Sequence, residues 1–180
     1  MFLYLEHDLL GISSVLLPYI LLFLFGVSEL SDAFDGYFAR KYDQVTDLGK
    51  ILDPMADSIY RISVFLTFTQ PPINLPLLLV FIFLYRDSVI STLRTICALR
   101  GFALAARATG KIKAIIQAGS LFTILLLMIP LSIGAVSIEL VRGVGIGIVT
   151  IAAIYALYSG IDYIYANREF VARLLTKPEP

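Results

Sequence analysis

Two pairs of aspartates stand out in a chain that is otherwise largely apolar. Asp32 and Asp35 are three residues apart and Asp53 and Asp57 are four apart, so each pair shares a face if its segment is helical. The first pair ends one apolar run and the second begins the next, so a helical hairpin brings all four together. Carboxylates at membrane depth are costly and usually functional. Four of them in a small volume require cations to neutralise them.

Such a cluster suits hard divalent cations, which prefer oxygen ligands. Two cations a few ångströms apart can clamp a phosphoryl group and stabilise its leaving oxygen. Gly36 and Gly49 permit close helix approach or a flat group near the metals, and Arg40 suits a phosphate at the membrane surface. In the alternative interpretation the aspartates are solvated helix ends that pair with nearby basic residues, namely Arg40, Lys41, Lys50 and Arg61.

The elements that must position these residues are membrane helices. Of the 180 residues, 58% are hydrophobic and 16% are charged, and the mean hydropathy is +0.85, which is too apolar for an ordinary soluble domain. We predict an all-α transmembrane helix bundle of about five spans, forming one domain over 1–180. The expected spans are about 10–40, 75–99, 106–133 and 141–165, together with a second span that begins between residues 49 and 53 and ends before residue 69. If that second span starts near Asp53, Pro54 lies in its first turn, where its missing N–H costs little. A short surface helix is expected over 167–173.

The distribution of basic residues orients the predicted bundle. Basic residues concentrate in the 40–50 and 100–113 connections and in the C-terminal tail, whereas Arg142 is the one basic residue in the opposite connections. By the positive-inside rule, the aspartates and the C-terminus face the cytoplasm and the N-terminus is external. The chain has 14 basic and 14 acidic residues, so no overall basic field indicates a nucleic-acid partner.

A second group of charged residues lies in the third and fourth predicted spans. Arg86 and Arg94 are eight residues apart and share a helix face, and arginines inside a membrane need an anionic partner that Asp87 alone does not supply. Lys111 and Lys113 open the fourth span on the same side. These residues predict a pocket for a phosphorylated, water-soluble alcohol. The alternative is that they extend to lipid headgroups or pair with the aspartates.

The spacing of the first motif resembles the signature of the CDP-alcohol phosphotransferase family, D-x2-D-G-x2-A-R-x8-G-x3-D-x3-D. All eight specified positions match: Asp32, Asp35, Gly36, Ala39, Arg40, Gly49, Asp53 and Asp57. The resemblance implies that the four aspartates hold two magnesium or manganese ions and that Asp57 also acts as general base. It also implies that an acceptor alcohol attacks the β-phosphorus of a CDP-linked alcohol and that CMP leaves.

The same resemblance assigns the two substrates to different residues. It places the CDP-lipid against five positions: Gly36, Ala39, Arg40, Thr46 and Gly49. The segments RDSVISTLR and TGKIKAIIQ are similar to a pattern of bacterial phosphatidylglycerophosphate synthases, with Asp87 in place of Glu and Ala114 in place of Thr. That similarity implies that CDP-diacylglycerol is the donor and glycerol 3-phosphate the acceptor, with Arg86, Arg94, Lys111 and Lys113 binding the acceptor.

Further expectations follow from the family. Its members usually have six spans, with an additional helix before the motif helix, whereas about ten residues precede the first span here, so the resemblance covers about 15–165. A bacterial cytoplasmic membrane, membrane lipid as a partner and a homodimer are also implied. The alternatives keep the chemistry with inositol phosphate, phosphatidylglycerol or serine as acceptor, or replace it with a divalent-cation transporter or a non-catalytic scaffold.

Two other features receive structural interpretations. The run Gly143-Val144-Gly145-Ile146-Gly147 lacks the strand that a nucleotide-binding loop needs, so its small residues predict close helix packing. Tyrosines near the expected span ends are interpreted as interfacial anchors, namely Tyr60, Tyr85, Tyr158, Tyr163 and Tyr165.

Overall fold

The computed structural model describes residues 15–42, 47–100 and 107–175, and within these ranges the chain forms helices and no strand. The helices are α2 (Leu17–Lys41), α3 (Asp47–Thr67), α4 (Leu77–Leu99), α5 (Ala108–Ser132), α6 (Ile138–Ala166) and the short α7 (Arg168–Leu175). The all-α prediction is confirmed. The external N-terminus is a prediction about residues 1–14, which lie outside the described ranges.

Helix boundaries follow the residues that start or stop helices. Pro76 caps α4, where its missing N–H is not needed. Gly134 has a φ of 72° just after α5, a conformation that glycine adopts without a steric penalty. The hydroxyl of Ser137 accepts a hydrogen bond of 3.3 Å from the backbone N–H of Leu140 and so caps α6.

The start of α3 corrects one expectation. We expected this helix to begin between residues 49 and 53, with Pro54 in its first turn, but it begins at Asp47 and Pro54 lies inside it. Aspartate is a favoured residue at a helix start, which explains the earlier boundary. Pro54 therefore removes one intrahelical hydrogen bond at the level of the site.

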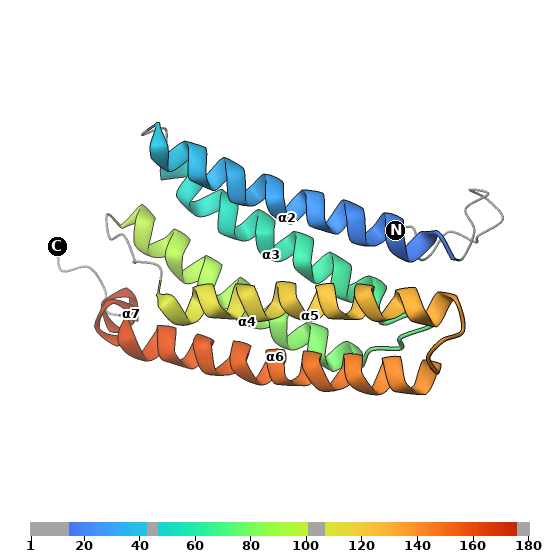
Figure 1. Cartoon of the computed structure of the whole chain (residues 1–180). Coiled ribbons are helices and arrows are strands. Elements are labelled where there is room, and N and C mark those ends of the chain that lie inside the picture. Colours follow the sequence, from blue (N-terminus) through green and yellow to red (C-terminus); the bar gives the residue numbers. More distant parts are fainter. Residues whose placement is uncertain (1–14, 43–46, 101–106, 176–180) are drawn as a thin grey trace.

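The ends of the helices that carry the charged motifs gather on one side of the bundle (Figure 1). There, the C-terminal ends of α2, α4 and α6 lie near the N-terminal ends of α3 and α5. Below this end the helices share an apolar core, in which the rings of Phe65 on α3 and Phe83 on α4 are 4.8 Å apart. Phe25 on α2 stacks on Tyr60 of α3 at 6.4 Å. The core fixes the helices whose ends present the site.

α6 packs closely on α4 and α5 through small buried residues, including Ala152, Ala153 and Ala156. A Cβ added to Gly145 would lie 3.6 Å from Ile124 of α5, so this glycine matches the packing interpretation of its segment. Gly143 and Gly147 have no such neighbour within 4 Å of an added Cβ. Only the middle glycine of the run is therefore in close helix contact.

Membrane insertion is supported by three helices. Within the part of the chain that the structure describes, the segments Leu17–Phe38, Ala108–Ser132 and Ile138–Ala166 are long and apolar enough to cross a bilayer. α3 and α4 fall outside this group, and they carry the charged residues Asp53, Asp57 and Arg61, and Arg86, Asp87 and Arg94, respectively. Five spans remain the prediction of the sequence.

Candidate active site

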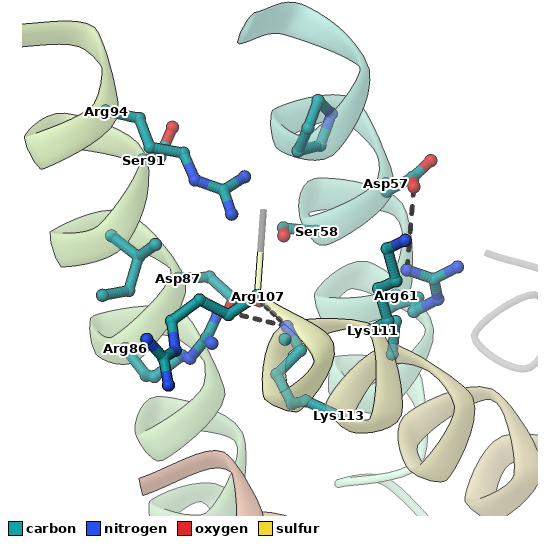
Figure 2. A pocket seen from close by; sticks show the side chains of 14 residues that line it. Asp57, Ser58, Arg61, Arg86, Asp87, Ser91, Arg94, Arg107, Lys111 and Lys113 are labelled. Carbon is teal, nitrogen blue, oxygen red and sulfur yellow. Dashed lines mark hydrogen bonds and ion pairs between the residues drawn. The ribbon is translucent and has the colours of Figure 1, made fainter. Parts of the chain in front are cut away.

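A cavity of about 230 Å³ lies between α3, α4 and the start of α5. Its charged lining residues are Asp57, Arg61, Arg86, Asp87, Arg94, Arg107, Lys111 and Lys113. Six of these are basic and two are acidic, so the lining carries excess positive charge. Figure 2 shows Arg94 extending from α4 toward α3, Lys111 and Lys113 at the start of α5, and Asp57 paired with Arg61 on α3. Concave positive surfaces of this kind attract phosphate-bearing ligands.

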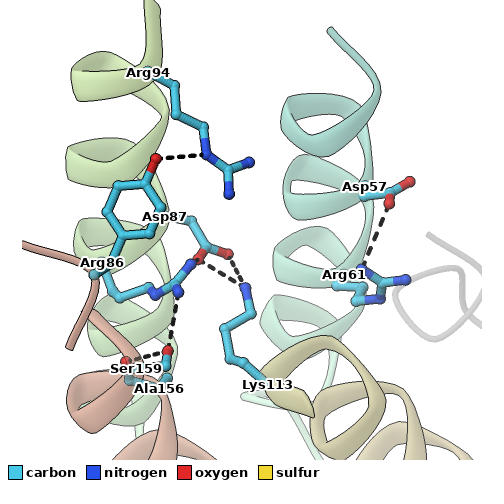
Figure 3. A network of polar contacts seen from close by, with 9 residues as sticks. Asp57, Arg61, Arg86, Asp87, Arg94, Lys113, Ala156 and Ser159 are labelled. Atoms are coloured by element: carbon cyan, nitrogen blue, oxygen red, sulfur yellow. Dashed lines mark hydrogen bonds and ion pairs between the residues drawn. The ribbon is translucent and has the colours of Figure 1, made fainter. Parts of the chain in front are cut away.

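Asp87 is the centre of a buried ion triad in the wall of this cavity (Figure 3). It accepts hydrogen bonds from Arg86 Nη1 at 2.9 Å and from Lys113 Nζ at 2.7 Å and 2.8 Å, one to each of its oxygens. The side chains of Asp87 and Lys113 are only 5% and 6% exposed. Two cations therefore share one carboxylate in a desolvated place, which leaves the triad with a net positive charge. Lys113 lines the cavity, as predicted, but two of its bonds go to Asp87.

Arg86 has a further support on α6. Its Nη2 donates to the hydroxyl of Ser159 at 2.9 Å, and Ser159 in turn donates to the carbonyl of Ala156 at 2.9 Å. Arg86 Nε is buried and has no hydrogen-bond partner among the described residues. Arg86 is thus held by side chains from two helices while it faces the cavity.

Arg94 and Arg107 are held by other residues of α6. Arg94 Nε donates to the hydroxyl of Tyr163 at 3.2 Å, and its guanidinium carbon lies 5.2 Å from the centre of that ring. Arg107 donates to both oxygens of Asp162, at 2.9 Å and 3.1 Å, and Thr109 donates to the same carboxylate at 2.8 Å. Tyr163 is buried, with 2% of its surface exposed, so its interpretation as an interfacial anchor was wrong.

Asp57 is the predicted aspartate that faces this basic cavity. Its carboxylate lies 3.9 Å from Arg61, one helical turn later on α3, and its side chain is 42% exposed. Arg61 also donates to Glu29 of α2 at 3.5 Å and so links the two helices of the hairpin. The carboxylates of Glu29, Asp32 and Asp53 are near enough to Asp57 for Coulombic repulsion.

The other predicted metal ligands, Asp32, Asp35 and Asp53, are exposed and do not line the basic cavity. Among the residues that the structure describes, no three His, Cys, Asp or Glu side chains are gathered closely enough to hold a metal ion. The four predicted aspartates nevertheless have the right ligand type for a hard divalent cation, because such cations prefer carboxylate oxygens. A bound cation would also offset the Coulombic repulsion that neighbouring carboxylates exert on Asp57.

The residues predicted to bind the CDP-lipid are described only in part. Gly36 on α2 and Gly49 on α3 are partly exposed at the motif end of the hairpin. Ala39 and Arg40 belong to α2, but their side chains lie outside the described part of the structure, and Thr46 lies wholly outside it. Lys111, predicted to bind the acceptor, is exposed and lines the cavity.

The sequence did not predict five of the residues that line the cavity or hold its arginines. They are Arg61, Arg107, Ser159, Asp162 and Tyr163. The spacing of Arg61, four residues after Asp57, was an available signal for an ion pair on one helix face. The three α6 residues gave no comparable signal, because their partners are 55 to 73 residues away along the chain.

Comparisons with known proteins indicate the family to which the chain is similar. The sequence model of the family described as CDP-alcohol phosphatidyltransferase matches residues 9–159. A protein of Bacillus subtilis named CDP-diacylglycerol–glycerol-3-phosphate 3-phosphatidyltransferase is 34% identical over 107 residues, which are 59% of this chain and 55% of that protein. The chain thus matches just over half the length of this relative.

Two further relatives extend the comparison. A Treponema pallidum protein with the same name is 32% identical over 148 residues, covering 81% of this chain and 67% of that protein. A Streptomyces coelicolor protein named cardiolipin synthase (CMP-forming) is 35% identical over 81 residues, covering 45% of this chain and 37% of that protein. The first two names state a phosphatidyl transfer that involves CDP-diacylglycerol and glycerol 3-phosphate, and the third states a synthesis of cardiolipin that forms CMP.

Proposed function

The chain belongs to the CDP-alcohol phosphatidyltransferase family, and from that premise we propose that it transfers a phosphatidyl group from CDP-diacylglycerol to glycerol 3-phosphate. The products are phosphatidylglycerophosphate and CMP. One observation carries the choice of acceptor: Asp57 shares a cavity with six basic side chains. A phosphorylated alcohol needs cationic groups around its phosphate and a base beside its hydroxyl, and this lining supplies both.

In the proposed reaction, an oxygen of the acceptor forms a bond to the β-phosphorus of the CDP-lipid, and the bond from that phosphorus to CMP breaks. The proton of the attacking hydroxyl passes to Asp57. The acceptor phosphate lies against Arg86, Arg94 and Lys111, which face the cavity from α4 and α5. We expect positioning to contribute more than proton abstraction, because the hydroxyl must be aligned with the phosphorus before it reacts.

The buried triad keeps the acceptor site positive. Asp87 neutralises one of the two cations that it contacts, so Arg86 and Lys113 together retain one positive charge beside the cavity. Lys113 is then mainly the counter-ion of Asp87, which differs from its predicted role as a direct acceptor ligand. Arg61 contacts Asp57 and Glu29 and so restrains the proposed base relative to α2.

We assign the predicted metal site to Asp32, Asp35, Asp53 and Asp57, as the carboxylates of one hairpin. Two divalent cations, magnesium or manganese, would polarise the phosphoryl group and neutralise the leaving CMP when bound. Gly36, Ala39, Arg40, Thr46 and Gly49 remain the residues proposed to bind the CDP-lipid. The proposed setting is a bacterial cytoplasmic membrane with the site facing the cytoplasm, supported by the apolar spans and by the bacterial relatives.

A second candidate acceptor is phosphatidylglycerol, because one relative is named cardiolipin synthase. It differs from glycerol 3-phosphate in carrying a phosphodiester with one negative charge and two acyl chains. The excess of basic over acidic side chains around the cavity favours the more highly charged, water-soluble acceptor. A cation transporter is disfavoured because those same basic groups repel a permeating metal ion.

The test is release of CMP by purified protein supplied with CDP-diacylglycerol and magnesium. Separate reactions contain glycerol 3-phosphate, glycerol, phosphatidylglycerol, inositol phosphate or serine. We expect CMP release with glycerol 3-phosphate and little with glycerol, which lacks the phosphate. CMP release with inositol phosphate or phosphatidylglycerol, in the absence of release with glycerol 3-phosphate, would contradict the acceptor assignment.

A further inference from the structure

We propose that one face of α6 positions the arginines of the acceptor cavity. This face, which we call the arginine-holding face, consists of Ser159, Asp162 and Tyr163, and it contacts Arg86, Arg107 and Arg94, respectively. None of its three residues is among the residues that line the cavity in the described structure, whereas all three arginines are. The inference rests on the proposed function only in identifying the bound group as the phosphate of an acceptor alcohol.

The spacing of the three residues places them together. Residues three and four positions apart lie on one side of a helix, so Ser159, Asp162 and Tyr163 project in the same direction from α6. Arg86 and Arg94 come from α4, and Arg107 directly precedes α5. One helix therefore sets the positions of guanidinium groups from two others.

Tyr163 holds Arg94 in two ways. Its hydroxyl accepts from Nε at 3.2 Å, and its ring lies 5.2 Å from the guanidinium carbon. A buried tyrosine usually needs a hydrogen-bond partner, and Arg94 provides it. Because the described bond uses Nε, the outer nitrogens remain the groups suited to a forked contact with phosphate.

Asp162 holds Arg107 where α5 begins. Both carboxylate oxygens accept from Arg107, and Thr109 in the first turn of α5 donates to one of them at 2.8 Å. A two-bond contact between a guanidinium and a carboxylate fixes the plane of the arginine. The same carboxylate therefore orients Arg107 and ties the start of α5 to α6.

Ser159 and Gly160 of α6 both lie against the side chain of Arg86. The hydroxyl of Ser159 accepts from Nη2 at 2.9 Å, and a Cβ added to Gly160 would lie 3.1 Å from Cγ of Arg86. That separation is shorter than an ordinary van der Waals contact, so a larger residue at 160 displaces Arg86 from its present position. α6 thus supplies a polar contact and the space that the arginine needs.

Arginines held in this way bind an anion with less loss of side-chain freedom than mobile ones. Loosening one of them should therefore weaken binding of the phosphate without changing the groups that react. The expected kinetic sign is a raised KM for glycerol 3-phosphate, with the KM for CDP-diacylglycerol and kcat nearly unchanged.

The test compares Tyr163→Phe with Tyr158→Phe, the same substitution at an exposed tyrosine of the same helix. We expect Tyr163→Phe to raise the KM for glycerol 3-phosphate by roughly three- to tenfold, the size expected for loss of one ordinary hydrogen bond. Tyr158→Phe should leave it unchanged. Equal KM values for the two variants would overturn the proposal, as would a Tyr163→Phe effect confined to kcat and thermal stability.

Binding of inorganic phosphate, measured by titration calorimetry, separates this inference from the proposed function. If the wild-type protein binds phosphate but uses another acceptor, the proposed function fails. The phosphate affinities of the variants, compared with one another, still decide whether α6 positions the arginines. Asp162→Asn provides a second test, because the amide keeps the shape of the carboxylate but loses its charge. Both Tyr163→Phe and Asp162→Asn should weaken phosphate binding relative to Tyr158→Phe, and unchanged binding in both would contradict the positioning role.

Discussion

The hairpin of α2 and α3, which carries Asp32, Asp35, Asp53 and Asp57 and which we call the acidic hairpin, meets the basic cavity at Asp57. The two regions differ in whether their charged side chains have internal partners. Arg86, Arg94, Arg107 and Lys113 each contact an internal partner, so the basic cavity is organised by the protein itself. Asp32, Asp35 and Asp53 are exposed, and the described residues contain no group of three acids gathered around a common point.

The difference indicates what each region needs in order to work. Opposite charges built into neighbouring helices attract one another, so the cavity keeps its shape without a ligand. Carboxylates alone repel one another and come together when cations are bound. We therefore expect the two regions to respond differently when cations or internal partners are removed.

Removal of divalent cations should have the largest effect. With a chelator present, we expect CMP release to stop, and added magnesium or manganese should restore it. Binding of inorganic phosphate, measured by calorimetry, should persist, because the cavity is held by internal ion pairs. Full activity in the chelator would show that the aspartates do not act through metal ions.

Substitution of the proposed base should have the next largest effect. Asp57→Asn removes a proton acceptor and a proposed metal ligand, so CMP release should fall about a thousandfold or more. The matched control is Glu139→Gln, which changes a carboxylate to an amide in the first turn of α6. Activity of Asp57→Asn within about tenfold of the control would contradict the catalytic role, since general acid–base catalysis contributes more than this.

Disruption of the buried triad of Arg86, Asp87 and Lys113 should lower the free energy of unfolding. Asp87→Asn leaves Arg86 and Lys113 close together without their shared carboxylate, and removing one partner of a buried pair costs about 3 kcal/mol or more. Lys113→Met should cost less, because Asp87 retains Arg86 as its partner. The two variants are compared by unfolding in detergent, and the reverse order of stability would rule out Asp87 as the centre of the triad.

The smallest effect is expected at Gly160. Gly160→Ala places a methyl group 3.1 Å from Cγ of Arg86, so the KM for glycerol 3-phosphate should rise roughly threefold, as expected for a loss of under 1 kcal/mol. Gly147→Ala on the same helix is the control, because an added Cβ there has no neighbour within 4 Å. An identical KM for the two variants would show that Arg86 tolerates the methyl group.

The sequence predicted the helices well because long apolar runs and breakers such as Pro76 and Gly134 mark their limits. It also predicted that Arg86, Arg94, Lys111 and Lys113 lie together, and these side chains line one cavity with Asp57. Helical periodicity was sufficient for this, because Arg86 and Arg94 share a face.

Contacts between distant segments could not be read from one sequence. Tyr163 has the residue type and position of an interfacial anchor, and only the packing of α6 against α4 shows that it is buried against Arg94. Asp162 and Ser159 likewise depend on contacts across 55 and 73 positions. Pro54 was misplaced because the start of α3 depends on residues before the apolar run.

Transfer of labelled glycerol 3-phosphate into extracted lipid tests the central claim most directly. Purified protein, CDP-diacylglycerol and magnesium are incubated with the labelled acceptor, and the lipid product and CMP are both measured. We predict that the label enters a lipid with the mass of phosphatidylglycerophosphate and that the amount of this lipid equals the amount of CMP released. The Asp57→Asn variant should form neither product. CMP release without labelled lipid, or labelled lipid formed equally well by Asp57→Asn, would contradict the assignment of the cavity as the acceptor site beside a catalytic aspartate.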